Sequence, residues 1–135
     1  MEKYRFLEHT ADIKFQAFGR TIEEAFENSA LALIKAMCKE KIRGKLKEKI
    51  IVKGKDKENL LYNFLEEFLF LLDTKNFVLD KILKMKIKGN SIEAEIIGDK
   101  TRNYKFDLDV KAITYNEMFV KQEKGRWICQ VVLDV

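Results

Sequence analysis

The stretch KILKMKIKGNSIEAEII, residues 81–97, decides the fold class of this chain. Apolar side chains alternate with lysines in its first half and with glutamates in its second half. Alternation with a period of two is typical of a β-strand that buries one face. Gly89 and Asn90 separate the two halves and favour a two-residue hairpin turn. We therefore predict an antiparallel hairpin in which Glu93 and Glu95 face the lysines of the first strand. The side chains predicted to face the core are Leu83, Met85, Ile87, Ile92, Ala94 and Ile96.

Two segments with helical spacing of apolar residues precede this hairpin. The first predicts a helix over residues 22–37, with Thr21 as the N-cap and Glu24 completing a capping box. The second predicts a helix over residues 57–73, capped by Asp56. Because this second helix is apolar over more than one face, we expect it to be deeply covered by other elements.

Other alternating segments predict further strands on both sides of the helices. These predicted strands are residues 12–18, 46–53, 104–110, 118–121 and 127–133. In the first of them, Ile13, Phe15 and Ala17 share one face, and Asp12 lies on the other. The turn residues around Gly125 are expected to link the last two strands as a second hairpin.

Hairpin-linked strands therefore outnumber helices, which predicts an α+β fold class. We expect a two-layer arrangement, in which two helices pack on a mostly antiparallel, hairpin-rich sheet. The chain contains no proline, and it has no glycine- and serine-rich linker. Residues 1–135 are therefore expected to form a single domain.

The composition is mildly basic, with a formal net charge of +4. This charge permits an RNA partner or an acidic protein partner but requires neither. The longest apolar run, residues 68–72, is far shorter than the ~20 residues that a membrane-spanning helix needs. The N-terminal residues are short, mixed and charged, unlike a signal peptide. We therefore expect a cytoplasmic protein that makes no membrane contact.

The residues that usually perform catalysis are scarce. The chain has one histidine, His9, and its two serines, Ser29 and Ser91, lie in a predicted helix and a predicted turn. No glycine-rich phosphate loop and no CxxC spacing occur, and Cys38 and Cys129 are interpreted as core thiols. An enzyme that acts alone on a nucleotide is therefore not expected.

Carboxylates offer one candidate site. Asp12 lies on the polar side of the first long strand, and Asp134 and Val135 end the sequence. If the first and last strands are neighbours, both aspartates and the carboxyl group of Val135 could share one hard cation, because Ca²⁺ and Mg²⁺ prefer oxygen ligands. The alternative is that these aspartates are ordinary solvated side chains.

His9 and Lys111 also have two interpretations each. A single histidine is commonly an exposed or hydrogen-bonded side chain without a catalytic role. Lys111 follows an aliphatic segment, and it is either a surface lysine beside a turn or a contact for a phosphate or carboxylate.

Five motifs, taken in order, resemble those of the archease family. They are EHTADI at residues 8–13, TIEEAF at 21–26, LLYNFLEEFL at 60–69, VKAITY at 110–115 and VVLDV at 131–135. Each motif alone is weakly specific, but their common order and spacing extend over the whole chain. One position departs from the pattern, since Asn116 stands where the family often has a histidine. Asparagine forms hydrogen bonds but cannot titrate.

The resemblance implies a function and a set of site residues. It implies a cytoplasmic, non-catalytic activator of the GTP-dependent tRNA-splicing RNA ligase, which promotes guanylylation of the ligase and its multiple turnover. Contact with tRNA is then indirect. The implied metal ligands are Asp12, Asp134 and Val135, with Ca²⁺ as the expected ion and Mg²⁺ as the alternative. Lys111 and His9 are the implied functional or partner contacts.

Two other functions remain open at this stage. The net charge and the lysine row of Lys84, Lys86 and Lys88 suggest an RNA-binding or chaperone-like module in RNA processing. The absence of an aromatic row on the lysine face argues against the stacking of single-stranded bases. A small hydrolase built on Asp12 and Asp134 lacks a clear general base.

Overall fold

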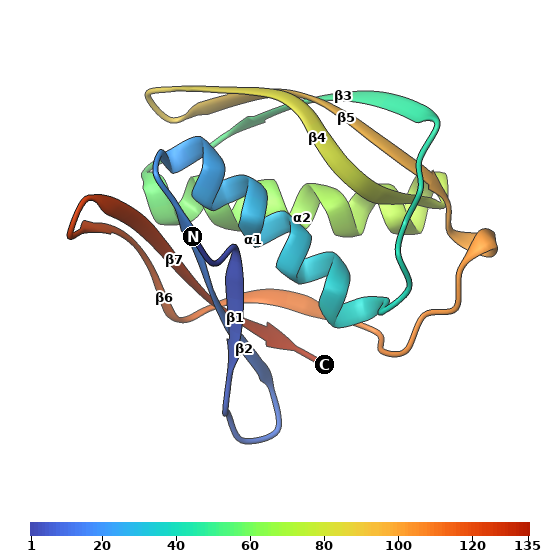
Figure 1. Cartoon of the computed structure of the whole chain (residues 1–135), viewed down its shortest axis with the longest axis horizontal. Helices are drawn as coiled ribbons and strands as arrows, with labels where there is room; N and C mark the ends of the chain where they lie inside the picture. Colours follow the sequence, from blue (N-terminus) through green and yellow to red (C-terminus); the bar gives the residue numbers. More distant parts are fainter.

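Two β-sheets enclose the two helices of this protein, as Figure 1 shows for the computed structural model, which describes residues 1–135. The four-stranded sheet consists, in spatial order, of β1 (Tyr4–Leu7), β2 (Ile13–Gly19), β7 (Arg126–Asp134) and β6 (Ala112–Glu123). The three-stranded sheet consists of β3 (Leu46–Lys53), β5 (Ser91–Lys100) and β4 (Phe77–Lys88). The two helices are α1 (Ile22–Met37) and α2 (Lys57–Lys75), and a short 3₁₀ turn, η1 (Thr101–Asn103), follows β5. All neighbouring strands are antiparallel, and the α+β class is confirmed.

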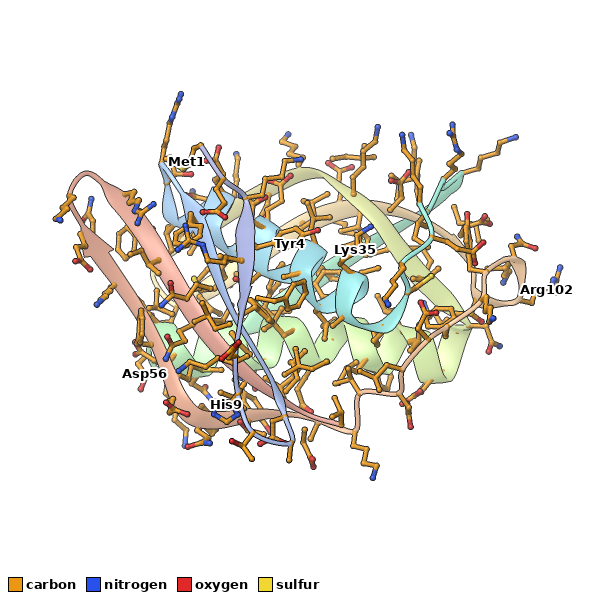
Figure 2. The ribbon with its side chains drawn as sticks, turned by 60° about the horizontal axis from the view of Figure 1, so that its bottom comes forward. Met1, Tyr4, His9, Lys35, Asp56 and Arg102 are labelled. Atoms are coloured by element: carbon orange, nitrogen blue, oxygen red, sulfur yellow. The ribbon has the colours of Figure 1, made fainter.

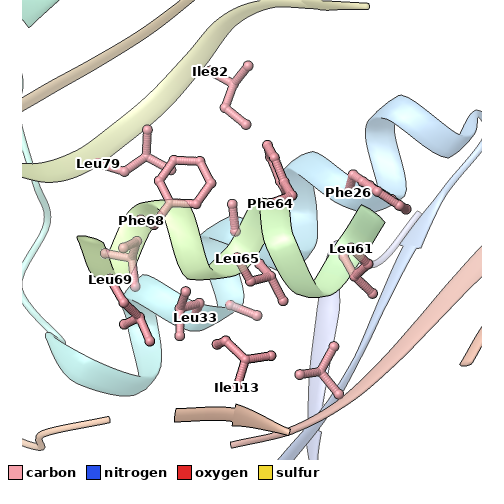
Figure 3. Close-up of a cluster of buried hydrophobic side chains, with 14 of the residues drawn as sticks. Phe26, Leu33, Leu61, Phe64, Leu65, Phe68, Leu69, Leu79, Ile82 and Ile113 are labelled. Atoms are coloured by element: carbon pink, nitrogen blue, oxygen red, sulfur yellow. The ribbon is translucent and has the colours of Figure 1, made fainter. Parts of the chain in front are cut away.

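The strands divide between two sheets, and both long helices contact both of them. The alternation in the sequence predicts which face of a strand is buried, but it does not identify the neighbouring strand. Helix α2 lies between β4 on one side and β6 on the other, and its side chains reach toward both (Figure 3). The rings of Phe26, Phe64 and Phe68 pack in sequence at this centre, with centroid distances of 5.9 and 5.0 Å. Burying a Leu or Phe side chain stabilises the fold by about 1.5–3 kcal/mol, so a helix that is apolar over more than one face is stabilised by cover on two sides.

Both helices begin where their capping residues predict. The Thr21 hydroxyl accepts a hydrogen bond from the backbone N–H of Glu24 at 3.1 Å, and the Glu24 carboxylate accepts from the N–H of Arg20 at 3.0 Å. The Asp56 carboxylate accepts from the N–H of Asn59 at 2.8 Å. The predicted limits of α1 are confirmed. Helix α2 continues two residues past the prediction, to Lys75, and it is capped by Asn76, whose φ of 52° is left-handed.

The predicted hairpin is confirmed, with one side chain on the wrong face. Strands β4 and β5 are joined at Gly89 and Asn90, and they pair antiparallel. Irregularities on either side of Lys81 and Ile82 shift the alternation of β4. Ile82 is therefore buried, and Leu83, predicted to face the core, is 47% exposed. A β-bulge changes the face of every residue on one side of it, which a strict period of two does not anticipate.

The prediction of a strand at residues 104–110 is wrong. This segment is extended, but it belongs to neither sheet. It crosses from β5 in one sheet to β6 in the other, and the Asp107 N–H donates to the carbonyl of Met37 at the end of α1 (2.8 Å). Its alternation reports packing, since Tyr104 and Phe106 contact the core and Val110 is buried.

Both cysteines are free and buried, which confirms their interpretation as core thiols. Burial raises the pKa of the Cys129 thiol to about 12, and it also raises the pKa of Cys38. Both thiols are therefore harder to ionise than a free cysteine. Neither α1 nor α2 combines the length and the apolar character that crossing a membrane requires.

Helix α2 offers a direct test of its double cover. Leu65 is fully buried, whereas Phe70 on the same helix is 55% exposed. We expect Leu65→Ala to lower the free energy of unfolding by about 2–5 kcal/mol, because it leaves a cavity in the core. Phe70→Ala should change it by no more than about 0.5 kcal/mol. Urea unfolding followed by circular dichroism measures both, and equal losses for the two variants would contradict the arrangement.

Candidate metal and partner site at the joined ends of β2 and β7

The pairing of β2 with β7 brings the start and the end of the sequence together. Ile13 lies opposite Leu133, and the strands pair antiparallel from this point onward. Asp12 directly precedes Ile13 and Asp134 directly follows Leu133, so both aspartates lie at the same end of the strand pair. Strand β6 flanks this end, where the backbone N–H of Lys111 donates to the carbonyl of Asp134 at 2.8 Å.

These residues differ in exposure. Asp12 is half-buried, whereas Lys111 and Asp134 are exposed. Val135 is half-buried, and it packs against the hydrophobic core. The side chain of Lys111 is therefore available to a partner, while its backbone is fixed beside Asp134.

The chemistry of this donor set fits a hard cation. Two carboxylate side chains and the carboxyl group of Val135 offer only oxygen ligands, which Ca²⁺ and Mg²⁺ prefer. Neither Asp12 nor Asp134 forms an ion pair within the protein. No group of three or more His, Cys, Asp or Glu side chains is arranged to hold a metal. An ion at this edge would therefore have two side-chain ligands at most, and backbone oxygens or water would complete its coordination.

His9 has a partner that the sequence did not reveal. Its Nε2 lies 2.8 Å from Oε2 of Glu117, and Nζ of Lys14 donates to the other carboxylate oxygen at 3.2 Å. The hydrogen bond from His9, followed by the contact with Lys14, lowers the pKa of Glu117. Nδ1 of His9 is buried and has no hydrogen-bond partner. Figure 2 places His9 in the connection between β1 and β2. Its contact with Glu117 links the motif at residues 8–13 to β6.

Glu117 occupies an interruption in β6. The β6–β7 register is irregular between Thr114 and Phe119, and Glu117 has a left-handed φ of 55°. Such a conformation costs a residue with a β-carbon about 1–2 kcal/mol. The buried Gln130 compensates, since its Nε2 donates to the carbonyl of Glu117 at 2.7 Å and its Oε1 accepts from Gln16 at 2.9 Å.

The interruption also directs Tyr115 toward α2. Its ring stacks on that of Tyr62, with centroids 4.3 Å apart and planes 9° from parallel. Its hydroxyl accepts a hydrogen bond from Nδ2 of Asn59 at 2.6 Å. The motif at residues 110–115 is thereby joined to the one at residues 60–69. Asn116, the departure from the family pattern, is exposed.

The fold and this edge define a small α+β protein that presents carboxylates and a lysine at the joined ends of two strands. The sequence matches the Archease protein family (MTH1598/TM1083) over residues 4–135, and the chain belongs to this family. It is 38% identical to the protein archease of Methanosarcina mazei over 99% of this chain and 97% of that protein. It is 40% identical to the protein archease of Pyrococcus furiosus over the full length of both.

Solved structures agree with the fold. The solution structure of Methanobacterium thermoautotrophicum protein 1598 matches with a TM-score of 0.82 and 29% identity, covering 100% of both chains. The crystal structure of a Thermotoga maritima protein named "an archease, possible chaperone" matches with a TM-score of 0.69. It is 19% identical, covers 96% of this chain and 94% of that one, and supports the fold alone.

The contact between His9 and Glu117 predicts a specific acid sensitivity. Because the pKa of Glu117 lies below its ordinary value of 4.5, the ionised carboxylate stabilises the folded state. That contribution to stability is complete at a pH above the ordinary pKa, and it is lost as the pH falls through the lowered pKa of the folded state. We expect Glu117→Gln to show a smaller drop in melting temperature between neutral and acidic pH than the wild type. The matched control is Glu93→Gln on the opposite sheet, and an equal change in both variants would contradict the role of this contact.

Proposed function

We propose that this chain is a non-catalytic activator of the GTP-dependent tRNA-splicing RNA ligase, which promotes guanylylation of the ligase and its multiple turnover in the cytoplasm. The observation that carries the proposal is the convergence of family motifs at one edge. Asp12 precedes β2, Lys111 precedes β6 and Asp134 ends β7, so all three lie where these strands meet. Family membership supports the same conclusion.

The distribution of reactive groups supports a role without chemistry of its own. His9 is engaged by Glu117, and the thiols of Cys38 and Cys129 are buried. Ser29 is buried inside α1, where its hydroxyl donates to the carbonyl of Ala25 at 2.8 Å. The exposed groups that remain at the edge are carboxylates and one lysine. Such groups can hold and orient charged groups of a partner through charge-assisted hydrogen bonds.

In this proposal Asp12, Asp134 and the carboxyl group of Val135 hold a divalent cation, with Ca²⁺ expected and Mg²⁺ the alternative. A bound cation would supply positive charge that attracts phosphate or carboxylate oxygens of the ligase. Lys111 adds a second positive charge beside it, on a backbone that its hydrogen bond to Asp134 keeps in place. Contact with tRNA occurs through the ligase.

The functional test is multiple-turnover ligation by a purified ligase with and without this protein. We expect wild-type protein to increase turnover and Lys111→Ala to remove most of the increase, by about tenfold or more, which corresponds to about 1.4 kcal/mol. Lys35→Ala, an exposed lysine on α1, is the matched control, and it should behave as the wild type. An unchanged turnover with wild-type protein would refute the proposal.

The metal site has a separate test that needs no ligase. A cation that binds only the folded protein raises its stability by about 2.7 kcal/mol at a hundredfold excess over the dissociation constant. We expect Ca²⁺ to raise the melting temperature of the wild type, and Asp12→Asn, Asp134→Asn or two residues added after Val135 to abolish the increase. Glu123→Gln serves as the control. A Ca²⁺ effect that survives all three changes would place the ion elsewhere.

An RNA-binding module is the second candidate, and one surface favours it. Lysines that form no ion pair cover the outer face of the three-stranded sheet. They are Lys47, Lys49, Lys53, Lys81, Lys84, Lys86 and Lys88. Glu93 and Glu95 lie among these lysines on the central strand β5. Binding to phosphates through such a face weakens steeply with salt, so a flat salt titration of RNA affinity would eliminate this candidate.

A further inference from the structure

A groove of about 550 Å³ lies beside α2, at the end of β3 and along the segment that leads into β6. Its apolar side chains include Ile51, which is 60% exposed, and Phe70, which is 55% exposed. These are two of the most exposed large apolar side chains in the protein, and they come from different elements. Exposed apolar side chains that gather at a hollow are typical of an interaction site, whereas single scattered ones are not.

The groove continues into a second hollow of about 360 Å³. The two share Leu72 and Asp109, and the second is lined by Phe106 and the partly exposed Leu108. Leu72 belongs to α2, whereas Phe106, Leu108 and Asp109 belong to the extended segment that crosses between the two sheets without joining either. Together the hollows form an elongated surface along the second half of α2. A length of polypeptide fits such a surface better than a compact small molecule, which needs an enclosed pocket.

The charge of the groove opposes that of the protein. Four carboxylates line the groove against two lysines, and none of the carboxylates forms an ion pair. The carboxylates are Glu66, Glu67, Asp73 and Asp109, and the lysines are Lys53 and Lys111. The chain as a whole has a net charge of +4, so this acidic rim is a local reversal of sign. Unpaired carboxylates around an apolar floor complement a segment that carries lysine or arginine beside apolar residues. They repel the phosphates of a nucleic acid.

One residue connects the groove to the candidate metal and partner site. Lys111 lines the groove, and its backbone N–H is bonded to the carbonyl of Asp134. A polypeptide that occupies the groove therefore lies close to Asp134 of that site. Binding in the groove and contact at the site then belong to one continuous surface, which fixes the orientation of the partner.

We propose that this groove docks a basic amphipathic segment of the protein partner. Apolar side chains of the segment cover Phe70 and Ile51, and its cations meet the carboxylates of Glu66, Glu67 and Asp73. The proposal rests on the proposed function for the identity of the partner, the RNA ligase. It adds the surface and the chemistry by which that partner is recognised.

The test measures the affinity of the full-length protein for the purified ligase at low and high salt, by biolayer interferometry. Phe70→Ala should weaken binding by about tenfold or more, as expected for an aromatic anchor. The double variant Glu66→Lys, Glu67→Lys should slow association and flatten its salt dependence. The matched controls are Leu83→Ala and Glu93→Lys, which alter an exposed apolar and an exposed acidic side chain on the outer sheet face. Urea unfolding confirms that each variant is folded.

The outcomes separate the two proposals. If the wild type binds and activates the ligase and the groove variants do so equally well, the groove proposal is overturned while the proposed function stands. If the wild type neither binds nor activates the ligase, both are overturned. Light scattering that shows a dimer of this chain, lost in Phe70→Ala, would replace the ligase segment with a second copy. An affinity for RNA that falls in Phe70→Ala would replace it with a nucleic acid.

Discussion

The antiparallel pairing of β2 with β7 is the interaction on which the functional edge depends. Phe15 lies opposite Val131, and Ala17 lies opposite Cys129, and all four side chains are fully buried. A slip of one residue would turn this whole set toward solvent, so core burial determines the register. The same register places Asp12 and Asp134 at one end of the pair. The geometry of a polar site is therefore a consequence of apolar packing several residues away.

Strand β6 contributes to the site through the interruption in its pairing with β7. The unpaired stretch between Thr114 and Phe119 releases Tyr115 to stack on α2 and Glu117 to contact His9. In a regular strand, Tyr115 and Glu117 would share the face of the buried Ile113 instead. The left-handed backbone at Glu117 is the cost of this arrangement, and strained residues of this kind concentrate at functional sites.

The contrast between predicted and observed features follows from the range of each interaction. Helix starts at Thr21 and Asp56 depend on residues three positions apart, so local sequence is sufficient to predict them. Bulges in β4 depend on the partner strand, so the exposure of Leu83 was missed. The alternation of apolar and polar residues over 104–110 reflects which side chains are buried, and it does not show whether the segment pairs with another strand. Asp12 and Asp134 lie at the same end of the β2–β7 pair, which the sequence allowed only as a condition, because alternation does not identify the neighbouring strand. His9 and Glu117, 108 residues apart, left no local signal of their contact.

The segregation of charge explains why composition says little about the partner. Lysines concentrate on the outer face of the three-stranded sheet, whereas carboxylates concentrate around Phe70 and at the ends of β2 and β7. A net charge of +4 averages over these regions, and it conceals a field of opposite sign beside the candidate site. Recognition at short range depends on the local field, because charges farther apart than about 10 Å are screened by salt. The groove beside Phe70 is mainly negative, whereas the exposed Lys111 next to it is a cation available to phosphate or carboxylate oxygens.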